Sequence, residues 1–282
     1  MPIRGGAGVS KLEDIIEGWY NAGDYDTLAD CLTEAGSNAV IIIPPTTYSE
    51  AITISGSNLI LRGSGWNTKI VGGTTGHAIN ITGDSVTIED LLVQTTAGQG
   101  NAYDGIYLNG ADDCVLRRIR LDQSDNEAIQ GVSSDRLTIE QCFLELTDSH
   151  MIHPNNGCTE WLLLNNYLKD AGNYTLLGQG NNGRVIGNHT LNGGNCFYVN
   201  APYWVLLGNF INNPSANGIG IDSGGDNSTM VGNFIYSAGE RGIYITTNAE
   251  DCVAVGNRIT GSGIANLTDN SGTSTVGYND LT

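Results

Sequence analysis

The sequence predicts an all-β protein, a parallel β-helix in which each turn of the solenoid contributes three short strands. Three observations carry this prediction: a repeat of 21 to 24 residues, short alternating apolar segments within each repeat, and an excess of glycine. Repeats of this length are typical of stacked solenoids, in which each unit buries its apolar face against its neighbours. The 39 glycines among 282 residues are close to twice the usual share of about 7%, and they predict many tight turns.

An asparagine that usually follows glycine anchors the repeat. The stretches "LGNFI" (207–211), "VGNFI" (231–235) and "VGNRI" (255–259) are each 24 residues apart, and Cys142 and Ile119 occupy the same position in earlier copies. Paired strands lie about 4.8 Å apart, so stacked amides can donate to one neighbour and accept from the other. We therefore predict an internal structural ladder of Asn166, Asn188, Asn209, Asn233, Asn257 and Asn279.

A second apolar segment in each repeat predicts a further strand. Segments such as "GIYLN" (105–109), "CFYVN" (196–200) and "GIYIT" (242–246) alternate and are rich in Ile, Val and Tyr, while Gly, Asn, Asp and Ser separate them. A leucine-rich repeat would need a helix or its consensus leucines in each copy, and a propeller blade needs about 40 residues or more. The parallel β-helix is the architecture that remains.

The N-terminal part extends this interpretation. Residues 39–73, "AVIIIPPTTYSEAITISGSNLILRGSGWNTKIVGG", contain a strand, a Pro/Tyr turn and "LRGSG". Together with the repeats, this segment resembles the right-handed parallel β-helix superfamily typified by pectate lyases and phage tailspikes, over roughly residues 38–282. The resemblance implies a right-handed, single-stranded β-helix. Many chemistries share this scaffold, so the fold by itself does not specify an activity.

A helical cap is expected before the solenoid, because an uncovered end exposes strand edges and core to water. The segment "VSKLEDIIEGWYNAGDYDTLADCLTEAG" (9–36) has helical spacing at Leu12, Ile15, Ile16 and Trp19, and it resembles the capping helix of the same superfamily. The expected division is therefore a helical cap or attachment segment at 1–37 and a β-helix at 38–282.

Charge and cysteine usage limit the partners. The chain carries 12 Lys and Arg against 30 Asp and Glu, a formal charge of −18, which repels nucleic-acid phosphates and anionic membranes. We expect neither partner. The N-terminus lacks the apolar core of a signal peptide, which predicts cytosolic synthesis, with a virion or cell surface reached by lysis or after removal of a leader. The six cysteines share no phase on neighbouring turns, so we expect them to be reduced and buried.

One outward row suits sugar recognition. If Ile106 and Leu108 point into the core, Tyr107 points out, and the same position recurs in later turns. Aromatic rings stack on pyranose faces and amides bridge hydroxyls. The alternative is a solvated polar face of the kind that any β-helix shows. The candidate ligand-binding residues are Tyr107, Gln130, His153, Tyr198, Asp222 and Tyr244.

Catalysis would be placed just before that strand. Asp104, Glu127 and His150 share one phase on three successive turns, so neighbours are expected roughly 5 Å apart. Retaining glycosidases hold their two carboxyls about 5–5.5 Å apart, which makes Asp104 and Glu127 a candidate acid and nucleophile. His150, with His153 and Asp148 nearby, would add a proton-transfer group. Chance stacking is the alternative, because 30 carboxylates are available and turns favour Asp.

A second row follows the asparagine ladder by one residue. If these residues face outward, they form a five-turn aromatic row that marks an interface or ligand groove; if inward, they form a core stack. An outward row would be explained by a homotrimer packed along its long axis, as in the tailspikes that the fold resembles. The row runs through Phe143, Tyr167, His189, Phe210 and Phe234.

Family motifs do not support an enzyme. Polygalacturonases carry NTD, a paired Asp, GHG and RIK, whereas this chain has only "ADDC" (111–114) and "RIR" (118–120), and the Arg-rich signature of pectate lyases is absent. No metal site or cofactor is predicted. Ca²⁺ is conceivable at Asp122 with Asp125, or at Asp222 with Asp226, but neither pair matches a calcium-loop consensus.

Two functions follow. The first is a non-enzymatic virion protein, such as a phage tail spike, fibre or capsid-decoration subunit, whose side face contacts glycans or sister subunits. The alternative is a polysaccharide-degrading hydrolase or lyase that works on the same face.

Overall fold

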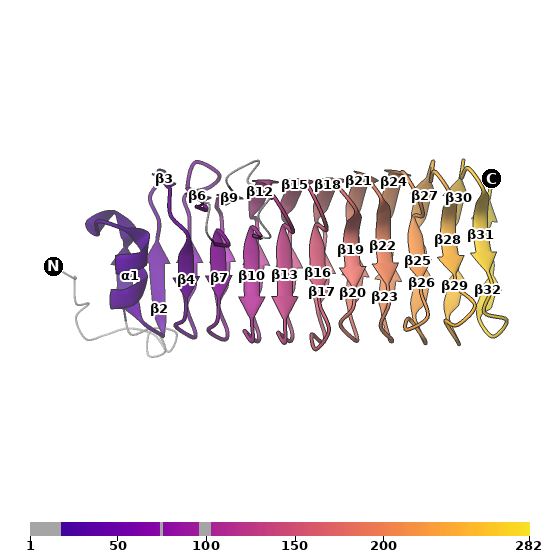
Figure 1. The fold of residues 1–282 in the computed structure, drawn as a ribbon, viewed down its shortest axis with the longest axis horizontal. Coiled ribbons are helices and arrows are strands. Elements are labelled where there is room, and N and C mark those ends of the chain that lie inside the picture. The colour runs from indigo at the N-terminus through magenta and orange to yellow at the C-terminus, as the bar shows by residue number, and fades with distance from the viewer. Residues whose placement is uncertain (1–17, 74–75, 96–102) are drawn as a thin grey trace.

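The computed structural model describes residues 18–73, 76–95 and 103–282. It confirms the predicted parallel β-helix: strands stack side by side along one axis, and the described chain has one short α-helix near its N-terminal end, preceded by a 3-10 turn at Ala22–Asp24 (Figure 1). Each complete turn places one strand in each of three sheets, and neighbouring strands within a sheet are parallel. The predicted three strands per turn are therefore present.

The first sheet has 12 strands and includes the first strand of the described chain. Its strands, in spatial order, are β1 (Gly18–Asn21), β2 (Ala39–Ile42), β5 (Ile60–Arg62), β8 (Thr87–Glu89), β11 (Val115–Arg117), β14 (Thr138–Glu140), β17 (Leu162–Leu164), β20 (Arg184–Ile186), β23 (Val205–Leu207), β26 (Thr229–Val231), β29 (Val253–Val255) and β32 (Thr275–Gly277).

The second sheet has 11 strands, and most of them begin directly after the asparagine ladder. They are β3 (Thr47–Tyr48), β6 (Lys69–Val71), β9 (Leu92–Gln94), β12 (Arg120–Gln123), β15 (Phe143–Thr147), β18 (Tyr167–Ala171), β21 (His189–Gly193), β24 (Phe210–Pro214), β27 (Phe234–Tyr236), β30 (Arg258–Thr260) and β33 (Asp280–Leu281).

The third sheet has 10 strands and carries the predicted sugar-binding row. They are β4 (Ile52–Ile54), β7 (Ile79–Ile81), β10 (Ile106–Asn109), β13 (Ile129–Val132), β16 (Ile152–Pro154), β19 (Tyr174–Gly178), β22 (Asn195–Val199), β25 (Ile219–Ile221), β28 (Arg241–Ile245) and β31 (Ala265–Asp269).

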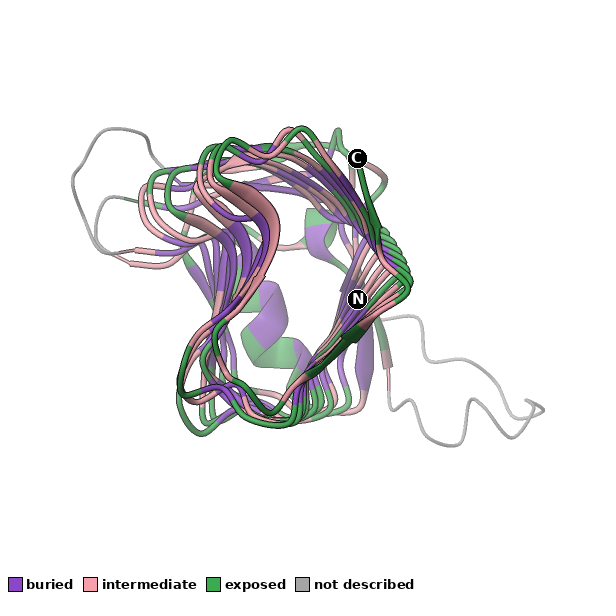
Figure 2. Cartoon of the chain, turned by 90° about the vertical axis from the view of Figure 1, so that its right-hand side faces the viewer, coloured by how far each residue is buried: buried purple, intermediate pink, exposed green. Residues whose placement is uncertain are grey.

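The core lies inside the tube, where buried residues from all three sheets face one another (Figure 2). In β10, Ile106 and Leu108 are fully buried and Tyr107 between them is half-buried, as the period-2 alternation predicts. Burying one such aliphatic side chain stabilises the fold by about 1.5–3 kcal/mol. Successive turns repeat this contribution as far as Ile259, whereas the last strands, β31 to β33, contain no buried residue.

The predicted asparagine ladder is confirmed. Nδ2 of Asn209 donates to Oδ1 of Asn233 at 2.9 Å and to the carbonyl of Val185 at 2.8 Å, and its own Oδ1 accepts from the backbone N–H of Asn188 at 2.9 Å. The pattern continues from Asn166 to Asn279. The residue before each ladder asparagine has a left-handed backbone, for example φ 62° at Gly208, which is why "GN" recurs.

An α-helix lies within the segment 9–36 that resembles a capping helix. The observed helix α1 (Leu28–Ala35) begins at Thr27, whose side chain accepts from the N–H of Asp30, and it buries its apolar face against the solenoid end. Of the four residues whose spacing predicted a helix, only Trp19 is described, and it lies in β1 and is exposed; Leu12, Ile15 and Ile16 lie outside the described residues. Since β1 pairs with β2, the first sheet starts inside the segment predicted as the cap.

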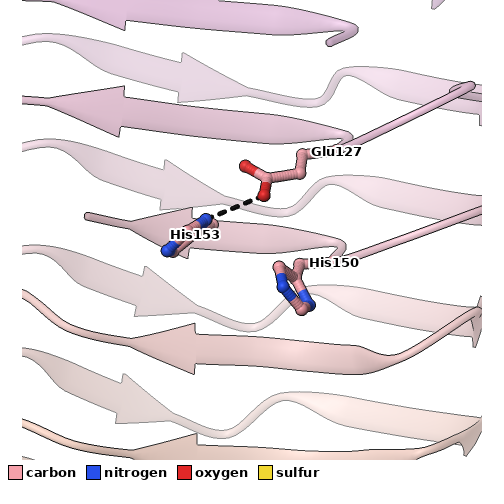
Figure 3. A group of neighbouring side chains, drawn as sticks. All are labelled: Glu127, His150 and His153. Carbon is pink, nitrogen blue, oxygen red and sulfur yellow. Dashed lines mark hydrogen bonds and ion pairs between the residues drawn. The ribbon is translucent and has the colours of Figure 1, made fainter. Parts of the chain in front are cut away.

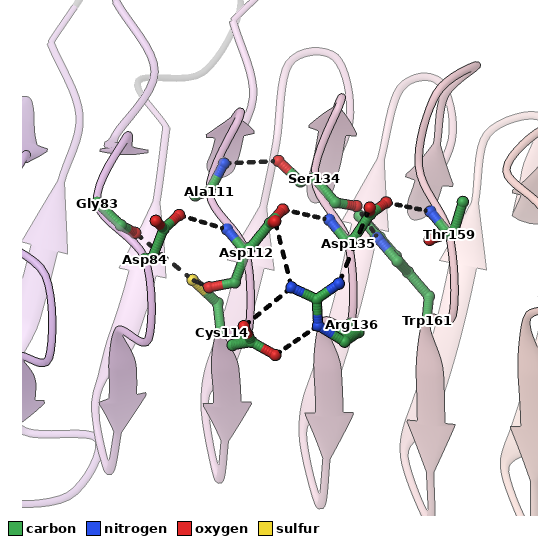
Figure 4. Close-up of polar contacts among 11 residues, drawn as sticks. Gly83, Asp84, Ala111, Asp112, Cys114, Ser134, Asp135, Arg136, Thr159 and Trp161 are labelled. Carbon is green, nitrogen blue, oxygen red and sulfur yellow. Dashed lines mark hydrogen bonds and ion pairs between the residues drawn. The ribbon is translucent and has the colours of Figure 1, made fainter.

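Acidic residues organise one corner of the solenoid (Figure 4). Oδ1 of Asp84 accepts the N–H of Asp112, Oδ1 of Asp112 accepts that of Asp135, and Oδ1 of Asp135 accepts that of Thr159, at 2.9, 2.9 and 2.7 Å. Arg136 also pairs with Asp112 and with the neighbouring Asp113. The "ADDC" carboxylates therefore hold turns together instead of forming a polygalacturonase-like pair.

The remaining general features agree with the sequence. All six cysteines are free and buried, as predicted. In the described part of the chain, no helix has the length and apolar character needed to cross a membrane.

Candidate functional site

The outward row of the 10-stranded sheet has the predicted register. Tyr107 pairs with Gln130, Gln130 with His153, and Tyr198 with Gly220, which in turn pairs with Tyr244. We call this surface the tyrosine–histidine face; it also includes Asp222, which follows β25 and accepts a hydrogen bond from the Tyr198 hydroxyl. Its members are Tyr107, Gln130, His153, Tyr198, Asp222 and Tyr244.

The rings of this face stack on protein groups. Tyr107 lies against His77, with ring centroids 4.3 Å apart and planes 10° apart, and Tyr198 lies against Tyr174 at 5.0 Å and 29°. The guanidinium of Arg241 covers Tyr244 at 4.5 Å. One face of each ring is therefore occupied within the chain, and whether sugars stack on the other face stays a prediction. Hydroxyls, amides and ring edges are the groups available for recognition.

The three predicted catalytic residues lie on successive turns, as their phase predicts. The N–H of Gly105 donates to the Glu127 carbonyl, and the N–H of Ala128 donates to the His150 carbonyl. Asp104, Glu127 and His150 precede β10, β13 and β16, respectively. Whether these residues catalyse a reaction stays a prediction, and their surroundings differ strongly.

Asp104 is fully buried. Its Oδ1 accepts from the backbone N–H of Glu127 at 3.1 Å and from Nδ2 of Asn126 at 2.8 Å. Its Oδ2 lies 3.2 Å from Nδ1 of His77, but that nitrogen accepts the N–H of Asp104 at 3.0 Å, so no hydrogen bond joins the two side chains. A carboxylate without exposed surface cannot touch a polysaccharide in this conformation. Its contacts instead position the turn that carries Glu127.

Glu127 and His153 form the central contact of the site. Nδ1 of His153 lies 2.8 Å from Oε1 of Glu127, and Nε2 of His153 lies 3.0 Å from Oε1 of Gln179. Both side chains are about nine-tenths or more buried, with 10% exposure for His153 and 6% for Glu127. Gln179 follows β19, one turn further along the solenoid. The imidazole is thus held between a carboxylate and an amide.

His150 completes the group without bonding to it (Figure 3). Its ring lies edge-on to that of His153, with centroids 5.3 Å apart, and tilted against Tyr174 at 5.0 Å. Its Nδ1 is buried and has no hydrogen-bond partner among the described residues, and the same holds for Oε2 of Glu127. Two polar atoms of one small cluster are therefore left unpaired, which is costly in a folded protein.

Burial and mutual contact shift the titration of the cluster. Burial raises the pKa of Glu127 above its usual value and outweighs the opposing hydrogen bond from His153. Burial lowers the pKa of His153, but the hydrogen bond and charge of Glu127 outweigh it, so the net pKa is raised. Burial, together with the charge of His153, lowers the pKa of His150 to about 4. His150 is therefore neutral near pH 7.

Two residues of the site were not among the predicted ones. His77 precedes the regular repeats, so it has no counterpart in the series that defined the row. Tyr174 belongs to the turn with "GNYTLLG" (172–178), which was not among the segments that defined the outward row. The signal for Tyr174 was available: the N–H of Met151 donates to its carbonyl, so it shares the phase of His150.

The aromatic row on the 11-stranded sheet faces outward. Phe210 is 38% exposed, and Phe143, Tyr167 and Phe234 are half-buried. Phe143 stacks on Tyr167 at 4.9 Å and 8°, and Phe210 stacks on Phe234 at 5.2 Å and 11°; His189 joins the two pairs edge-on.

Cations close both ends of this row. Arg120 lies over Phe143 and Trp66, and Arg258 lies over Phe234. The ring faces are consequently used within the chain and their edges point to solvent. Whether the row contacts sister subunits stays a prediction.

The two conceivable Ca²⁺ pairs have other contacts. Asp122 forms an ion pair with Arg120, and Asp222 accepts from the Tyr198 hydroxyl and from the N–H of Ser223. Within the described ranges, the group with metal-like spacing is instead Glu127, His150 and His153, whose potential ligand atoms all lie within 4.8 Å of one another. Phase had already brought these three residues together as candidates for catalysis, but no metal site was predicted there.

Solved structures with a similar architecture include two phage proteins. Open reading frame 18 of Geobacillus virus E2 superposes with a TM-score of 0.74 at 15% identity, covering 95% of this chain and 60% of that one. The enzymatically active domain of bacteriophage CBA120 tailspike protein 2 gives 0.69 at 16%, covering 93% and 45%. The chain has the right-handed parallel β-helix fold of pectate lyase-like and tailspike proteins. At these identities the likeness concerns the fold alone.

Carbohydrate-active proteins share the same architecture. A PL6 family polysaccharide lyase from Pseudopedobacter saltans has a TM-score of 0.65 at 12% identity, over 86% of this chain and 63% of that one. The chain thus spans about half to two thirds of the length of these β-helix proteins. No family model and no curated protein matches its sequence. The β-helix fits both phage tail proteins and polysaccharide-acting proteins.

Proposed function

We propose that this chain is the β-helical body of a virion-associated protein of the phage tailspike type, and that its tyrosine–histidine face binds a polysaccharide. The observation that carries the proposal is a row of hydroxyl, amide and imidazole groups from Tyr107 to Tyr244, which parallel pairing holds in register and which Leu177 and Gly220 interrupt. The phage β-helix proteins, which superpose over more than nine-tenths of the chain, support the virion context.

Charge narrows the class of polysaccharide. A net charge of −18 repels a polyuronate, and the face itself contributes Asp222 alongside the single guanidinium of Arg241. Hydrogen bonding to hydroxyls through tyrosine and carboxylate groups suits a neutral chain of sugars. We therefore expect neutral bacterial surface polysaccharides to bind in preference to acidic ones.

A binding experiment tests this function. Purified protein is titrated against a panel of neutral and acidic bacterial polysaccharides, together with the variants Tyr198→Phe and Asp222→Asn. The matched control is Tyr236→Phe, which removes a hydroxyl from an exposed tyrosine on the 11-stranded sheet. We expect the two face variants to weaken binding about tenfold, since each hydrogen bond to a charged or buried group is worth about 1.5 kcal/mol. Absence of binding across the panel, or equal loss in the control, would overturn the proposal.

A second function, polysaccharide cleavage, is favoured by one observation. The Glu127 carboxyl has a raised pKa through burial, which is the property of a general acid, and neutral His150 lies beside it. Release of reducing ends or unsaturated products from the same panel tests it. Glu127→Gln is expected to abolish release, whereas Asp104→Asn would act through the turn it holds. No release by the wild type across the panel excludes this function.

Sister subunits are the further partner that we propose. The aromatic row from Phe143 to Phe234 faces outward, and a trimer packed along the solenoid axis would cover it. Mass photometry tests the oligomeric state. A species of about three times 29.8 kDa supports the trimer, and a single species near 29.8 kDa contradicts it.

A further inference from the structure

The Glu127 cluster combines the donor groups of a transition-metal site. Glu127 supplies a carboxylate, while His150 and His153 supply imidazoles from the next turn, three residues apart. One ligand atom from each lies within 4.8 Å of the other two. An ion with bonds of about 2.0–2.2 Å holds its ligands about 3–4 Å apart, so small side-chain rotations would close the site.

The atoms left unpaired in the cluster are those that an ion would use. Oε2 of Glu127 and Nδ1 of His150 are buried and have no hydrogen-bond partner among the described residues. The Glu127 side chain is only 6% exposed, so its second oxygen cannot rely on solvent. Buried polar atoms normally have partners, and a bound cation would supply one to both.

The outer contacts of His153 already have the arrangement found around metal ligands. Its Nε2 faces Oε1 of Gln179 at 3.0 Å, an acceptor that fixes the ring orientation and leaves Nδ1 toward Glu127 and His150. Gln130 Nε2 lies 3.5 Å from the same Nδ1, too far for a strong hydrogen bond. An ion bound there would replace the hydrogen that now joins Nδ1 to Oε1 of Glu127, and that proton would leave to solvent.

The charge around the site also favours a cation. Asp104 lies near both Glu127 and His153 and adds negative charge, and no Lys or Arg contacts the three ligands in the described structure. Two imidazoles and one carboxylate suit Zn²⁺, Co²⁺ or Ni²⁺, whereas Ca²⁺ and Mg²⁺ prefer oxygen ligands throughout.

We propose that Glu127, His150 and His153 bind one divalent transition-metal ion of the Zn²⁺, Co²⁺ or Ni²⁺ class on the side of the solenoid. The remaining coordination positions would be filled by water or by a ligand on the tyrosine–histidine face. This proposal does not depend on glycan binding or cleavage.

Metal titration of the full chain tests the site. Protein stripped with a chelator is titrated with Zn²⁺ by calorimetry, and with Co²⁺ by visible absorption, which reports nitrogen and oxygen coordination. We expect one ion per chain. His150→Ala and Glu127→Gln should each weaken binding about tenfold or more, and Gln179→Ala should weaken it about 10–100-fold as an outer contact. The matched control is His189→Ala, because His189 is exposed on the 11-stranded sheet.

Thermal unfolding separates loss of the site from loss of the fold. Zn²⁺ is expected to raise the unfolding midpoint of the wild type and of His189→Ala, but not that of His150→Ala. If His150→Ala does not fold, His150→Gln replaces it, since it retains a polar side chain of similar length. Absence of Zn²⁺, Co²⁺ and Ni²⁺ binding by the wild type, or equal affinity in the His150 and His189 variants, would overturn the proposal.

Discussion

Asn209 and Asn233 lie one turn apart in the interior of the solenoid, and Nδ2 of Asn209 donates to Oδ1 of Asn233 across 2.9 Å. Both are buried. Each asparagine in this ladder also serves backbone groups of neighbouring turns that no water reaches. The ladder therefore does more than join side chains, because it supplies hydrogen-bond partners to the backbone where the chain bends between the first and second sheets.

Removing one member of the ladder should destabilise the protein. In Asn209→Ala, the carbonyl of Val185 and the N–H of Asn188 lose their side-chain partner while they remain inside. Each of these two groups costs about 1–3 kcal/mol, so we expect a loss of about 2–6 kcal/mol in the free energy of unfolding, measured by urea denaturation. Asn248→Ala, in an exposed turn after β28, is the control. Equal midpoints for the two variants would contradict the structural role.

A buried carboxylate near the N-terminal end should make the free energy of unfolding decrease at low pH. Glu89 is fully buried and pairs with Arg62 at 2.5 Å, with Arg118 at 2.8 Å and with Arg117. Burial raises the pKa of Glu89, but hydrogen bonds from Arg117 and Arg62 outweigh it and leave the pKa below its usual value of 4.5. A carboxyl with a lowered folded-state pKa contributes stability above its unfolded pKa and loses it as the pH falls through the folded value.

The wild type is therefore expected to lose stability below about pH 4.5, with a steeper loss than Glu89→Gln shows. At pH 7, Glu89→Gln should cost about 2 kcal/mol or more, because three guanidinium groups lose their common partner. Thermal unfolding between pH 3 and pH 7 measures both effects, with Glu34→Gln, exposed in α1, as the control. Parallel pH profiles for Glu89→Gln and the wild type would refute this account.

One glycine is required by a buried tryptophan. A Cβ on Gly183 would lie 2.3 Å from the ring of Trp204, which is 1% exposed and anchored by a hydrogen bond from Nε1 to the carbonyl of Gly180 at 2.7 Å. Gly183→Ala is expected to cost about 1–3 kcal/mol through overpacking. Gly277→Ala, where nothing lies within 4 Å of the added Cβ, should leave the thermal midpoint unchanged. A stable Gly183→Ala variant would mean that the Trp204 ring can move.

The cysteines should be chemically silent in the folded protein. Burial raises the pKa of Cys142 to about 12 and that of Cys114 to about 11, and all six thiols are free and buried. Because the thiolate is the reactive form, a chromogenic disulfide reagent at pH 8 is expected to label none of them before unfolding and all six in denaturant. Rapid labelling of a native thiol would show that one of these positions opens.

The solenoid could be predicted from the sequence because the repeat assigns each residue to an equivalent position in successive turns. Once Asn209, Asn233 and Asn257 are aligned, every residue between them has a defined strand and side, and the register from Tyr107 to Tyr244 follows. The grouping of Glu127 with His150 follows in the same way. The observed helix lies within the segment 9–36 that was expected to cap the solenoid, whereas Trp19, which fits a helical pattern, pairs as a strand.

The position of a residue in the repeat does not predict how deeply its side chain is buried or which side chains it contacts. Asp104 and Glu127 share a position in the repeat, yet only the structure shows that Asp104 is fully enclosed by the contacts around it. His77 lies in a turn before the regular repeats, and its stacking on Tyr107 depends on side-chain orientation. Ring stacking along both aromatic surfaces likewise depends on side-chain torsions, which periodicity does not determine.

The regular turns also set the length of the molecule in equal steps. From Asn209 to Asn257, two turns of 24 residues each add one step of about 4.8 Å to the length, and each turn pairs only with the turns before and after it. Cutting out or duplicating one such 24-residue cassette would move everything beyond it by a single step while leaving each side chain in its own row. The length of the solenoid and the chemistry of its surface can thus change independently, and one ladder asparagine marks each such turn.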